Sequence, residues 1–246
     1  MLQIRKYQED LYILEDDRVR QFLLLGPDKA ILLDTGFPDS ETLPAVRSLT
    51  DKLIQVLLTH GDFDHAGRLD DFAEAWLHEK DWPLVHTTAR LHPLREGDVF
   101  TCGEFRLAVL EIPGHTYGSV AFWDREKGLL FSGDSVQKEG PIYLFGGHRN
   151  VPLFVESERK LAGIADRFVT VFPCHHDCPI TPDYIEKNLQ DARALLAGTL
   201  PHTSTPGMPC DTYQGQWTAF YCTEEDLLNS KRGTGTHGGA CTPITP

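Results

Sequence analysis

Residues 59–67 read Thr-His-Gly-Asp-Phe-Asp-His-Ala-Gly, with two imidazoles and two carboxylates within the six positions from His60 to His65. On a loop, this spacing can direct the four side chains around a shared space. Imidazole nitrogens mixed with carboxylate oxygens suit zinc, iron or manganese. A polar loop with Asp64 at a helix N-terminus would explain a single such residue. The density of donors instead favours metal binding, with ligands for two neighbouring cations.

Other metal-type residues follow predicted strands elsewhere in the chain. Mostly apolar runs predict buried strands at 53–58, 105–112, 128–131 and 169–172. The residues that follow these strands are His60, His115, Asp134 and His175. Side chains just beyond strand ends are held by a rigid sheet yet reach open space, which is how α/β proteins build sites. We therefore expect these four side chains to meet in one site.

The remaining pattern predicts an α/β layered protein. Short strands at 3–6, 11–14, 19–25 and 30–33, separated by acidic or Gly-Pro-Asp turns, predict an antiparallel meander. After them strands and helices alternate. Apolar spacing and capping residues predict helices at 40–49, 67–75, 156–166 and 182–198, with a further strand at 119–123.

The chain changes character near its end. We divide it into a main domain at 1–201 and an extension at 202–246 that is rich in Thr, Gly and Pro, packed on the domain or partly flexible. One strand-like piece, 217–221, interrupts this extension. A homodimer joined through the extension is an open alternative.

Composition excludes several classes of protein. The 246 residues carry a formal charge of −13 and no Lys/Arg cluster, which argues against nucleic-acid binding. The N-terminal residues are charged and no run approaches the ~18 apolar residues of a membrane span, so we expect a cytoplasmic protein without a membrane partner. The six cysteines are expected to be reduced thiols in that compartment.

Five short motifs, in order, carry a resemblance to a known family. They are Leu33-Asp34-Thr35-Gly36, His60-x-Asp62-x-Asp64-His65, Pro113-Gly114-His115-Thr116, Ser132-Gly133-Asp134 and Pro173-Cys174-His175. The set resembles the ordered motifs of the metallo-β-lactamase superfamily over most of the chain. Within the superfamily the phrasing is most similar to glyoxalase-II-like and lactonase-like hydrolases.

The resemblance implies a fold and a ligand set. The fold is a four-layer αβ/βα sandwich of two mixed β-sheets flanked by helices, with a two-metal site at its edge. His60 and His115 would hold the first metal, and Asp64, His65 and His175 the second, with Asp134 between them. Asp34 would orient a ligand from outside the site, as outer-sphere carboxylates do. A turn capped by Thr35-Gly36 is an alternative role for Asp34.

Asp62 departs from the family pattern, which usually has a second histidine here. If Asp62 is a ligand, three carboxylates, one hydroxide and two divalent cations sum to zero charge, one unit lower than with histidine. An added anionic donor makes the metal pair a weaker Lewis acid. Zinc stays the first expectation, and the carboxylate makes iron or manganese more plausible. It also favours weak occupancy of one position.

The implied activity is metal-dependent hydrolysis. Two cations about 3.5–4 Å apart would activate a bridging hydroxide against a small ester, thioester or lactone, with Asp64 orienting the hydroxide or taking its proton. Tyr143 and His148 lie in a loop that commonly lines the pocket in this family, and His148 could donate to a substrate oxyanion. The alternatives are a phosphodiesterase and a non-haem iron oxidoreductase of the same fold. The second lacks a flavodoxin-like partner domain in this chain.

Overall fold

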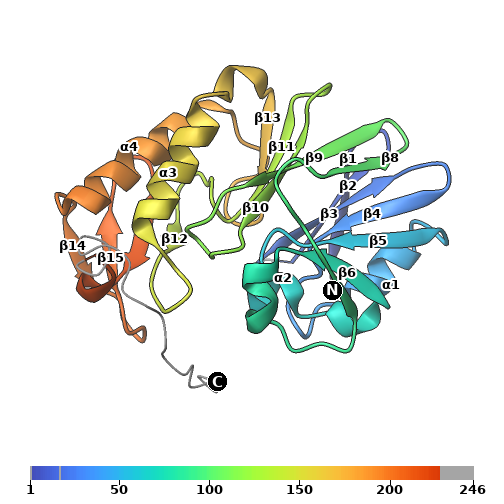
Figure 1. Ribbon diagram of the computed structural model, residues 1–246, viewed down its shortest axis with the longest axis horizontal. Coiled ribbons are helices and arrows are strands. Elements are labelled where there is room, and N and C mark those ends of the chain that lie inside the picture. Colours follow the sequence, from blue (N-terminus) through green and yellow to red (C-terminus); the bar gives the residue numbers. More distant parts are fainter. Residues whose placement is uncertain (1, 17, 228–246) are drawn as a thin grey trace.

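The first β-sheet is mixed and has seven strands (Figure 1). The computed structural model describes residues 2–16 and 18–227. The sheet runs in chain order through β1 (Gln3–Gln8), β2 (Leu11–Glu15), β3 (Arg20–Leu25), β4 (Lys29–Leu33), β5 (Leu53–Leu57), β6 (Glu74–Leu77) and β7 (Arg90–Pro93). The strands β1–β4 pair antiparallel, and β4–β7 pair parallel. The predicted N-terminal meander is confirmed.

The second sheet has the order β13-β11-β10-β9-β8. Its strands are β8 (Val99–Cys102), β9 (Phe105–Glu111), β10 (Val120–Asp124), β11 (Leu129–Gly133) and β13 (Thr170–Pro173). Most neighbours are antiparallel, but β11 and β13 are parallel. This sheet is mixed as well.

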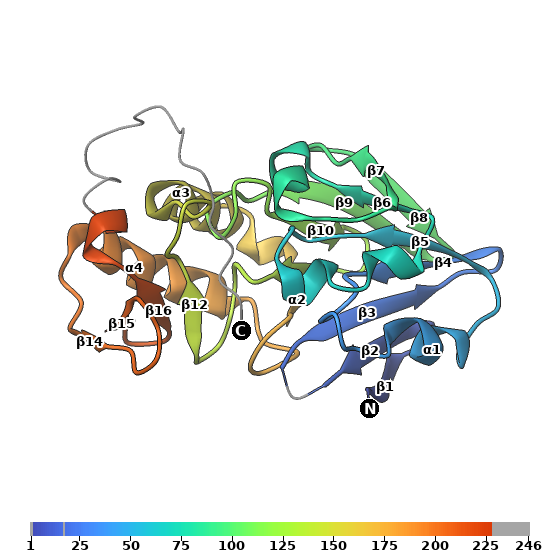
Figure 2. The ribbon, with the colours of Figure 1, turned by 90° about the horizontal axis from the view of Figure 1, so that it is seen from below.

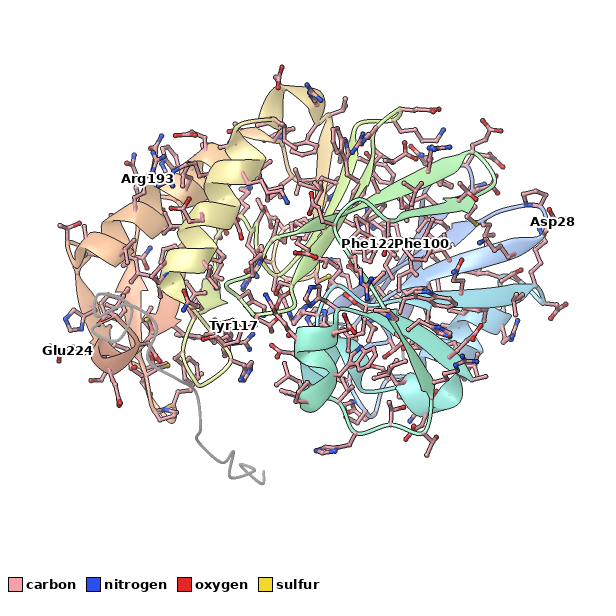
Figure 3. All side chains as sticks on the ribbon, viewed as in Figure 1. Asp28, Phe100, Tyr117, Phe122, Arg193 and Glu224 are labelled. Atoms are coloured by element: carbon pink, nitrogen blue, oxygen red, sulfur yellow. The ribbon has the colours of Figure 1, made fainter. Side chains whose placement is uncertain are left out.

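The core between the two sheets is apolar and aromatic. Phe22 of the first sheet lies with its ring centroid 5.1 Å from that of Phe131 in the second, and Phe131 stacks on Phe172 at 4.9 Å. Phe122 lies fully buried in the same core, whereas Asp28 and Arg193 point to solvent (Figure 3). Each fully buried phenylalanine contributes roughly 1.5–3 kcal/mol through the hydrophobic effect.

Helices cover the outer faces of both sheets. Val46 of α1 (Thr42–Arg47) packs in the apolar cluster on the outer face of the first sheet. Leu161 of α3 (Val151–Ala162) and Ile185 of α4 (Asp183–Ala197) pack on the second sheet. The layers are therefore helix, sheet, sheet and helix, as predicted.

A third sheet adjoins α3 and α4 (Figure 2). Its order is β12 (Pro141–Tyr143), β16 (Ala219–Cys222), β15 (Asp211–Gln214) and β14 (His202–Ser204). Because β16 pairs with β12, the segment after residue 202 joins a strand from the middle of the chain. Phe154 of α3 and Phe220 of β16 share one buried cluster. The division at residue 201 stays a prediction, and residues 228–246 of the predicted extension lie outside the described residues.

Two predicted helices differ from the structure. The helix predicted at 67–75 is wrong: α2 (Phe63–Ala66) ends before Gly67, Leu69–Asp71 is a single 3-10 turn, and β6 follows. Ala75 and Leu77 are buried while Glu74 is exposed, which is the alternation of a strand. The helix predicted at 156–166 begins earlier, at Val151, because the Asn150 side chain caps it by accepting a hydrogen bond from the Leu153 N–H.

Other elements are short. Two further 3-10 helices lie at Glu79–Leu84 and Ala165–Arg167.

The described cysteines are free thiols: no disulfide joins Cys102, Cys174, Cys178, Cys210 or Cys222. Cys241 lies outside the described residues. Within the described ranges, no helix has the length and apolar character that a membrane span requires.

Candidate metal centre

The loop after β5 turns directly into α2 and presents its polar side chains at one edge of the sandwich. The Asp62 carbonyl accepts hydrogen bonds from the N–H groups of His65 (3.0 Å) and Ala66 (2.9 Å), which closes a single helical turn. Gly67 follows, where a Cβ would lie 2.4 Å from the Pro38 nitrogen. A larger residue at 67 would push the turn away, so this glycine fixes the position of the loop.

Asp34 anchors this loop through hydrogen bonds to Thr59 and His65. Its Oδ1 accepts the Thr59 N–H at 2.7 Å, and its Oδ2 accepts the Thr59 hydroxyl at 2.8 Å and lies 2.9 Å from His65 Nδ1. Asp34 is fully buried and has a positive φ of 62°. The buried Cys174 thiol also lies 3.5 Å from Oδ2. Asp34 therefore contacts His65 from outside the cluster.

The other predicted donors come from the second sheet. His115 follows β9, Asp134 follows β11 and His175 follows β13. Gly114 has a φ of +142°, and a Cβ there would lie 2.3 Å from the Phe154 backbone nitrogen. The close approach of α3 therefore requires glycine next to His115.

All four histidines use Nδ1 outside the cluster. His115 Nδ1 lies 3.0 Å from the Tyr143 carbonyl and His175 Nδ1 lies 2.6 Å from the Arg18 carbonyl, so both nitrogens must donate. His65 Nδ1 donates to the Asp34 carboxylate. The Thr59 hydroxyl gives its proton to Asp34 and accepts from His60 Nδ1 at 3.0 Å. Each neutral ring therefore presents its Nε2 lone pair to the cluster, the arrangement of metal-binding histidines.

The Nε2 atoms and the carboxylates converge in two groups. In the first group, His60 Nε2 and His115 Nε2 lie 3.2 Å apart, and Asp62 Oδ2 lies 3.5 and 3.3 Å from them. The second group is Asp64, His65 and His175, whose donor atoms lie within 4.8 Å of one another.

Asp134 lies between the two groups. Its Oδ2 is 3.5 Å from His115 Nε2 and 3.2 Å from His175 Nε2, while its Oδ1 is 3.4 Å from His65 Nε2. The structure thus brings all seven predicted donors together in one cluster, with a carboxylate from β11 shared by both halves.

The donors fit a divalent cation. His65 Nε2 and Asp134 Oδ1 are buried and have no hydrogen-bond partner among the residues that the structure describes. A buried polar atom without a partner costs about 1–3 kcal/mol, which a bound ion would offset. Imidazole nitrogens with carboxylate oxygens form a donor set suited to zinc, iron or manganese.

The carboxylates of the cluster favour positive charge on the neighbouring histidines. Burial lowers the pKa of His175, but the Asp134 and Asp64 carboxylates outweigh burial and raise this pKa to about 10. Burial likewise opposes protonation of His65, yet Asp134, Asp64 and Asp34 hold its pKa well above the usual value. A bound cation would take the place of these protons.

The first group differs because a guanidinium lies beside it. Burial and the Arg149 guanidinium lower the pKa of His115 to about 4. Burial raises the pKa of Asp62, but Arg149 and the neighbouring histidines hold it well below its usual range. Arg149 Nη2 donates a hydrogen bond to Asp62 Oδ2, and Nη1 donates to the His115 carbonyl at 2.6 Å.

Two important residues carried no signal in the sequence. Asp81 is fully buried and accepts hydrogen bonds from the Gly61 and Gly118 N–H groups and the Thr116 hydroxyl, at 2.9, 2.8 and 2.6 Å. It joins the loop of His60 to the loop of His115. Arg149 is the second. Both act through contacts across the fold and belong to no local motif.

The predicted substrate residues lie near the cluster. His148 Nε2 is 3.5 Å from Asp62 Oδ1, and its side chain is 37% exposed. Tyr143 is half-exposed and packs its ring against Tyr221, at a centroid distance of 4.8 Å. Neither contact tests a role in substrate binding, so both roles stay predictions.

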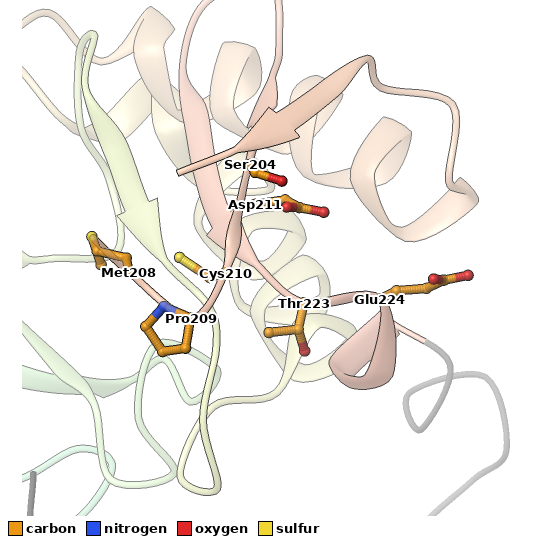
Figure 4. Close-up of a pocket in the computed structure, with 7 residues that line it drawn as sticks. All are labelled: Ser204, Met208, Pro209, Cys210, Asp211, Thr223 and Glu224. Atoms are coloured by element: carbon orange, nitrogen blue, oxygen red, sulfur yellow. The ribbon is translucent and has the colours of Figure 1, made fainter. Parts of the chain in front are cut away.

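Two surface hollows differ in their relation to the cluster. One reaches His175 and is lined also by Asp16, Arg18, Val19, Arg20 and His176. The other lies in the third sheet (Figure 4) and is lined by Ser204, Met208, Pro209, Cys210, Asp211, Thr223 and Glu224, none of them a predicted site residue. Of these two hollows, the one beside His175 reaches a predicted metal-type donor.

Comparison with known proteins agrees with this geometry. A family model of the metallo-beta-lactamase superfamily matches residues 15–175, and the chain belongs to this superfamily. A hydroxyacylglutathione hydrolase of Bdellovibrio bacteriovorus is 28% identical over 193 residues, which cover 75% of this chain and 67% of that protein. An acyl-coenzyme A thioesterase of Gallus gallus is 28% identical over 211 residues, covering 65% of this chain and 73% of that protein.

Solved structures show the same fold. A metallo-beta-lactamase family protein from Thermus thermophilus superposes with a TM-score of 0.68 at 24% identity, covering 79% of this chain and 83% of that one. A metallo-beta-lactamase from Pontibacter korlensis gives a TM-score of 0.70 at 16% identity, covering 78% of this chain and 99% of that one. These likenesses confirm the four-layer sandwich.

Proposed function

We propose that this protein is a metal-dependent hydrolase that cleaves a small thioester, ester or lactone at a centre of two divalent cations, with zinc as the first expectation. The observation that carries the proposal is the convergence of four histidine Nε2 atoms and three carboxylates in one cluster. His60, Asp62 and His115 would hold one ion, and Asp64, His65 and His175 the other. Asp134 would be shared by both ions.

The bound cations and the side chains of this protein would have separate roles in hydrolysis. Two cations held by these residues would supply a water of lowered pKa and would polarise the substrate carbonyl. Asp64 is 15% exposed at its side chain and belongs to the group that the hollow beside His175 reaches. We assign to Asp64 the orientation of the attacking water and the acceptance of its proton. His148 would donate to the oxygen on which negative charge develops.

Thioesters are the favoured substrates. The names of two relatives, a hydroxyacylglutathione hydrolase and an acyl-coenzyme A thioesterase, both describe thioester cleavage. The half-exposed Tyr143 beside Tyr221 offers an aromatic surface for the acyl group. The formal charge of −13 disfavours long polyanions such as RNA.

A substrate panel tests the proposal. The zinc-loaded protein is assayed with a glutathione thioester, an acyl-coenzyme A thioester, a lactone, a nitrophenyl ester and a nitrophenyl phosphodiester. We expect thiol release from at least one thioester, with kcat/KM above that for the phosphodiester. Phosphodiester cleavage alone, or no hydrolysis of any acyl substrate, would contradict the proposal.

Matched histidine variants separate the site from the fold. His115→Ala should lower kcat/KM by at least about 100-fold, because it removes a donor of the first group. His86→Ala changes a histidine that is exposed and lies outside the cluster. It should leave kcat/KM unchanged. Equal activity of the two variants would exclude the cluster as the catalytic centre.

A further inference from the structure

Arg149 contacts the centre but has no role in the proposed hydrolysis. It lies 87 positions after Asp62, just before α3, and its side chain is only 8% exposed. Its Nη2 donates to Asp62 Oδ2, the same oxygen that faces His60 and His115. Its Nη1 donates to the backbone carbonyl of His115. The guanidinium is therefore held against the first group from two sides.

The charge of Arg149 compensates the departure at position 62. With aspartate in place of the neutral histidine, two divalent ions, one hydroxide and three carboxylates sum to zero. The buried guanidinium adds one positive charge and returns the sum to the value of a centre with histidine at 62. A buried guanidinium without its carboxylate would be an unpaired charge beside the ion, which is costly.

We propose that Asp62 and Arg149 together replace a histidine ligand, with Asp62 as the donor and Arg149 as the positioning residue that neutralises it. This inference rests on the metal centre proposed above. Arg149 orients Oδ2 toward His60 and His115, and it leaves Oδ1 facing His148. The carboxylate at 62 then needs no change of metal from zinc to iron.

Substitution of the pair tests the idea without an activity assay. The variants are Asp62→His, Arg149→Gln and the double variant, each dialysed against Zn²⁺ and analysed for zinc per chain. The wild type and Arg149→Gln should bind two ions. Asp62→His should bind about one, because the guanidinium then repels the first ion. The double variant should regain two ions, with a dissociation constant for the weaker ion at least tenfold lower than in Asp62→His.

Two controls separate the effect of the Arg149 charge from loss of an arginine in general and from misfolding. Arg159→Gln removes an exposed arginine from α3 and should bind two ions with wild-type affinity. If Asp62→His does not fold, the comparison is made between Asp62→His with Arg149→Lys and Asp62→His with Arg149→Gln. The lysine retains the charge, so the first of these should lose one ion and the second should keep both.

The two proposals fail in different ways. Equal zinc binding by Asp62→His and the double variant, within twofold in affinity, would overturn the role of Arg149 and leave the metal centre intact. A wild-type protein that binds no divalent ion would overturn the proposed function itself.

Discussion

Asp34 sets the direction of His65 although it lies outside the proposed ligand set. Its two oxygens accept hydrogen bonds from Thr59 and from His65 Nδ1, so the imidazole can present only Nε2 to the centre. Asp34 has a positive φ, and its carboxylate contacts the loop through Thr59 and His65. The orientation of this proposed ligand therefore depends on a residue 31 positions earlier in the chain.

Asp34→Asn should weaken zinc binding by about 10–100-fold, because an amide can no longer accept all three hydrogen bonds. Competition with a chromogenic chelator measures the change. Asp39→Asn is the matched control: Asp39 is exposed and pairs with Arg18 on the surface. Zinc affinity in Asp34→Asn equal to that of this control would show that Asp34 does not orient His65.

Asp81→Asn should destabilise the fold by about 1–3 kcal/mol, because an amide has one acceptor oxygen and leaves at least one of the three buried donors without an acceptor. The free energy of unfolding is measured in urea. Asp28→Asn, at the exposed turn between β3 and β4, provides the reference. A destabilisation no larger than that of the reference would mean that Asp81 does not hold the two loops together.

The sequence predicted the metal-type donors of the centre, but it did not predict the residues that hold those donors in place. His60, His115, Asp134 and His175 could be found because each follows a buried strand, and the dense loop added the other donors. Arg149 and Asp81 could not be found in this way. Their partners lie 87 and 20 positions away, and only folding brings these groups together. Local patterns carry no signal for such contacts.

At the scale of elements, α3 carries a buried carboxyl group. Glu158 is fully buried, and neither carboxylate oxygen has a hydrogen-bond partner within the described part of the chain. Burial alone raises its pKa well above the usual value. Between the unfolded and folded pKa values, the folded state keeps a proton that the unfolded chain releases. Stability therefore falls as the pH rises through this window.

Glu158→Gln should remove this pH-dependent cost. Near pH 4, where the unfolded chain also holds the proton, the variant and the wild type should have similar Tm values. The Tm of the variant should then rise relative to the wild type as the pH increases to 8. Glu156→Gln, an exposed neighbour on the same helix, should show no such trend. A Tm difference that does not change with pH would contradict the assignment.

Element prediction succeeded for most of the two main sheets and for α4. The strands β1–β5, β9, β10, β11 and β13 and the helix α4 lie within two residues of the predicted ranges. The strands β6, β7 and β8 have only four residues each, which is too short to distinguish a strand period from a helix period in the sequence. The start of α3 carried a signal in Asn150-Val151-Pro152, since a capping residue and a proline mark a helix N-terminus.

At the scale of the whole molecule, the centre joins the two sheets. The loop of His60 and the helix α2 follow β5 of the first sheet. His115, Asp134 and His175 follow strands of the second sheet. Ions bound between these elements would bind the folded chain and not the unfolded one. Metal binding should therefore contribute to global stability.

Removal of metal by a chelator should lower the Tm, and added Zn²⁺ should restore it. At a free zinc concentration of 100 times the dissociation constant, binding stabilises by about 2.7 kcal/mol. Differential scanning calorimetry across a zinc series measures the effect. His65→Ala, which lacks a proposed ligand of the second group, should respond less than the wild type. A Tm independent of zinc would contradict a metal centre shared by the two sheets.

The most direct measurement is anomalous X-ray diffraction at the zinc edge from crystals grown with Zn²⁺. The account predicts two anomalous peaks per chain on either side of Asp134, one among His60, Asp62 and His115 and one among Asp64, His65 and His175. A map without a peak at these donors, or with zinc bound only elsewhere, would contradict it.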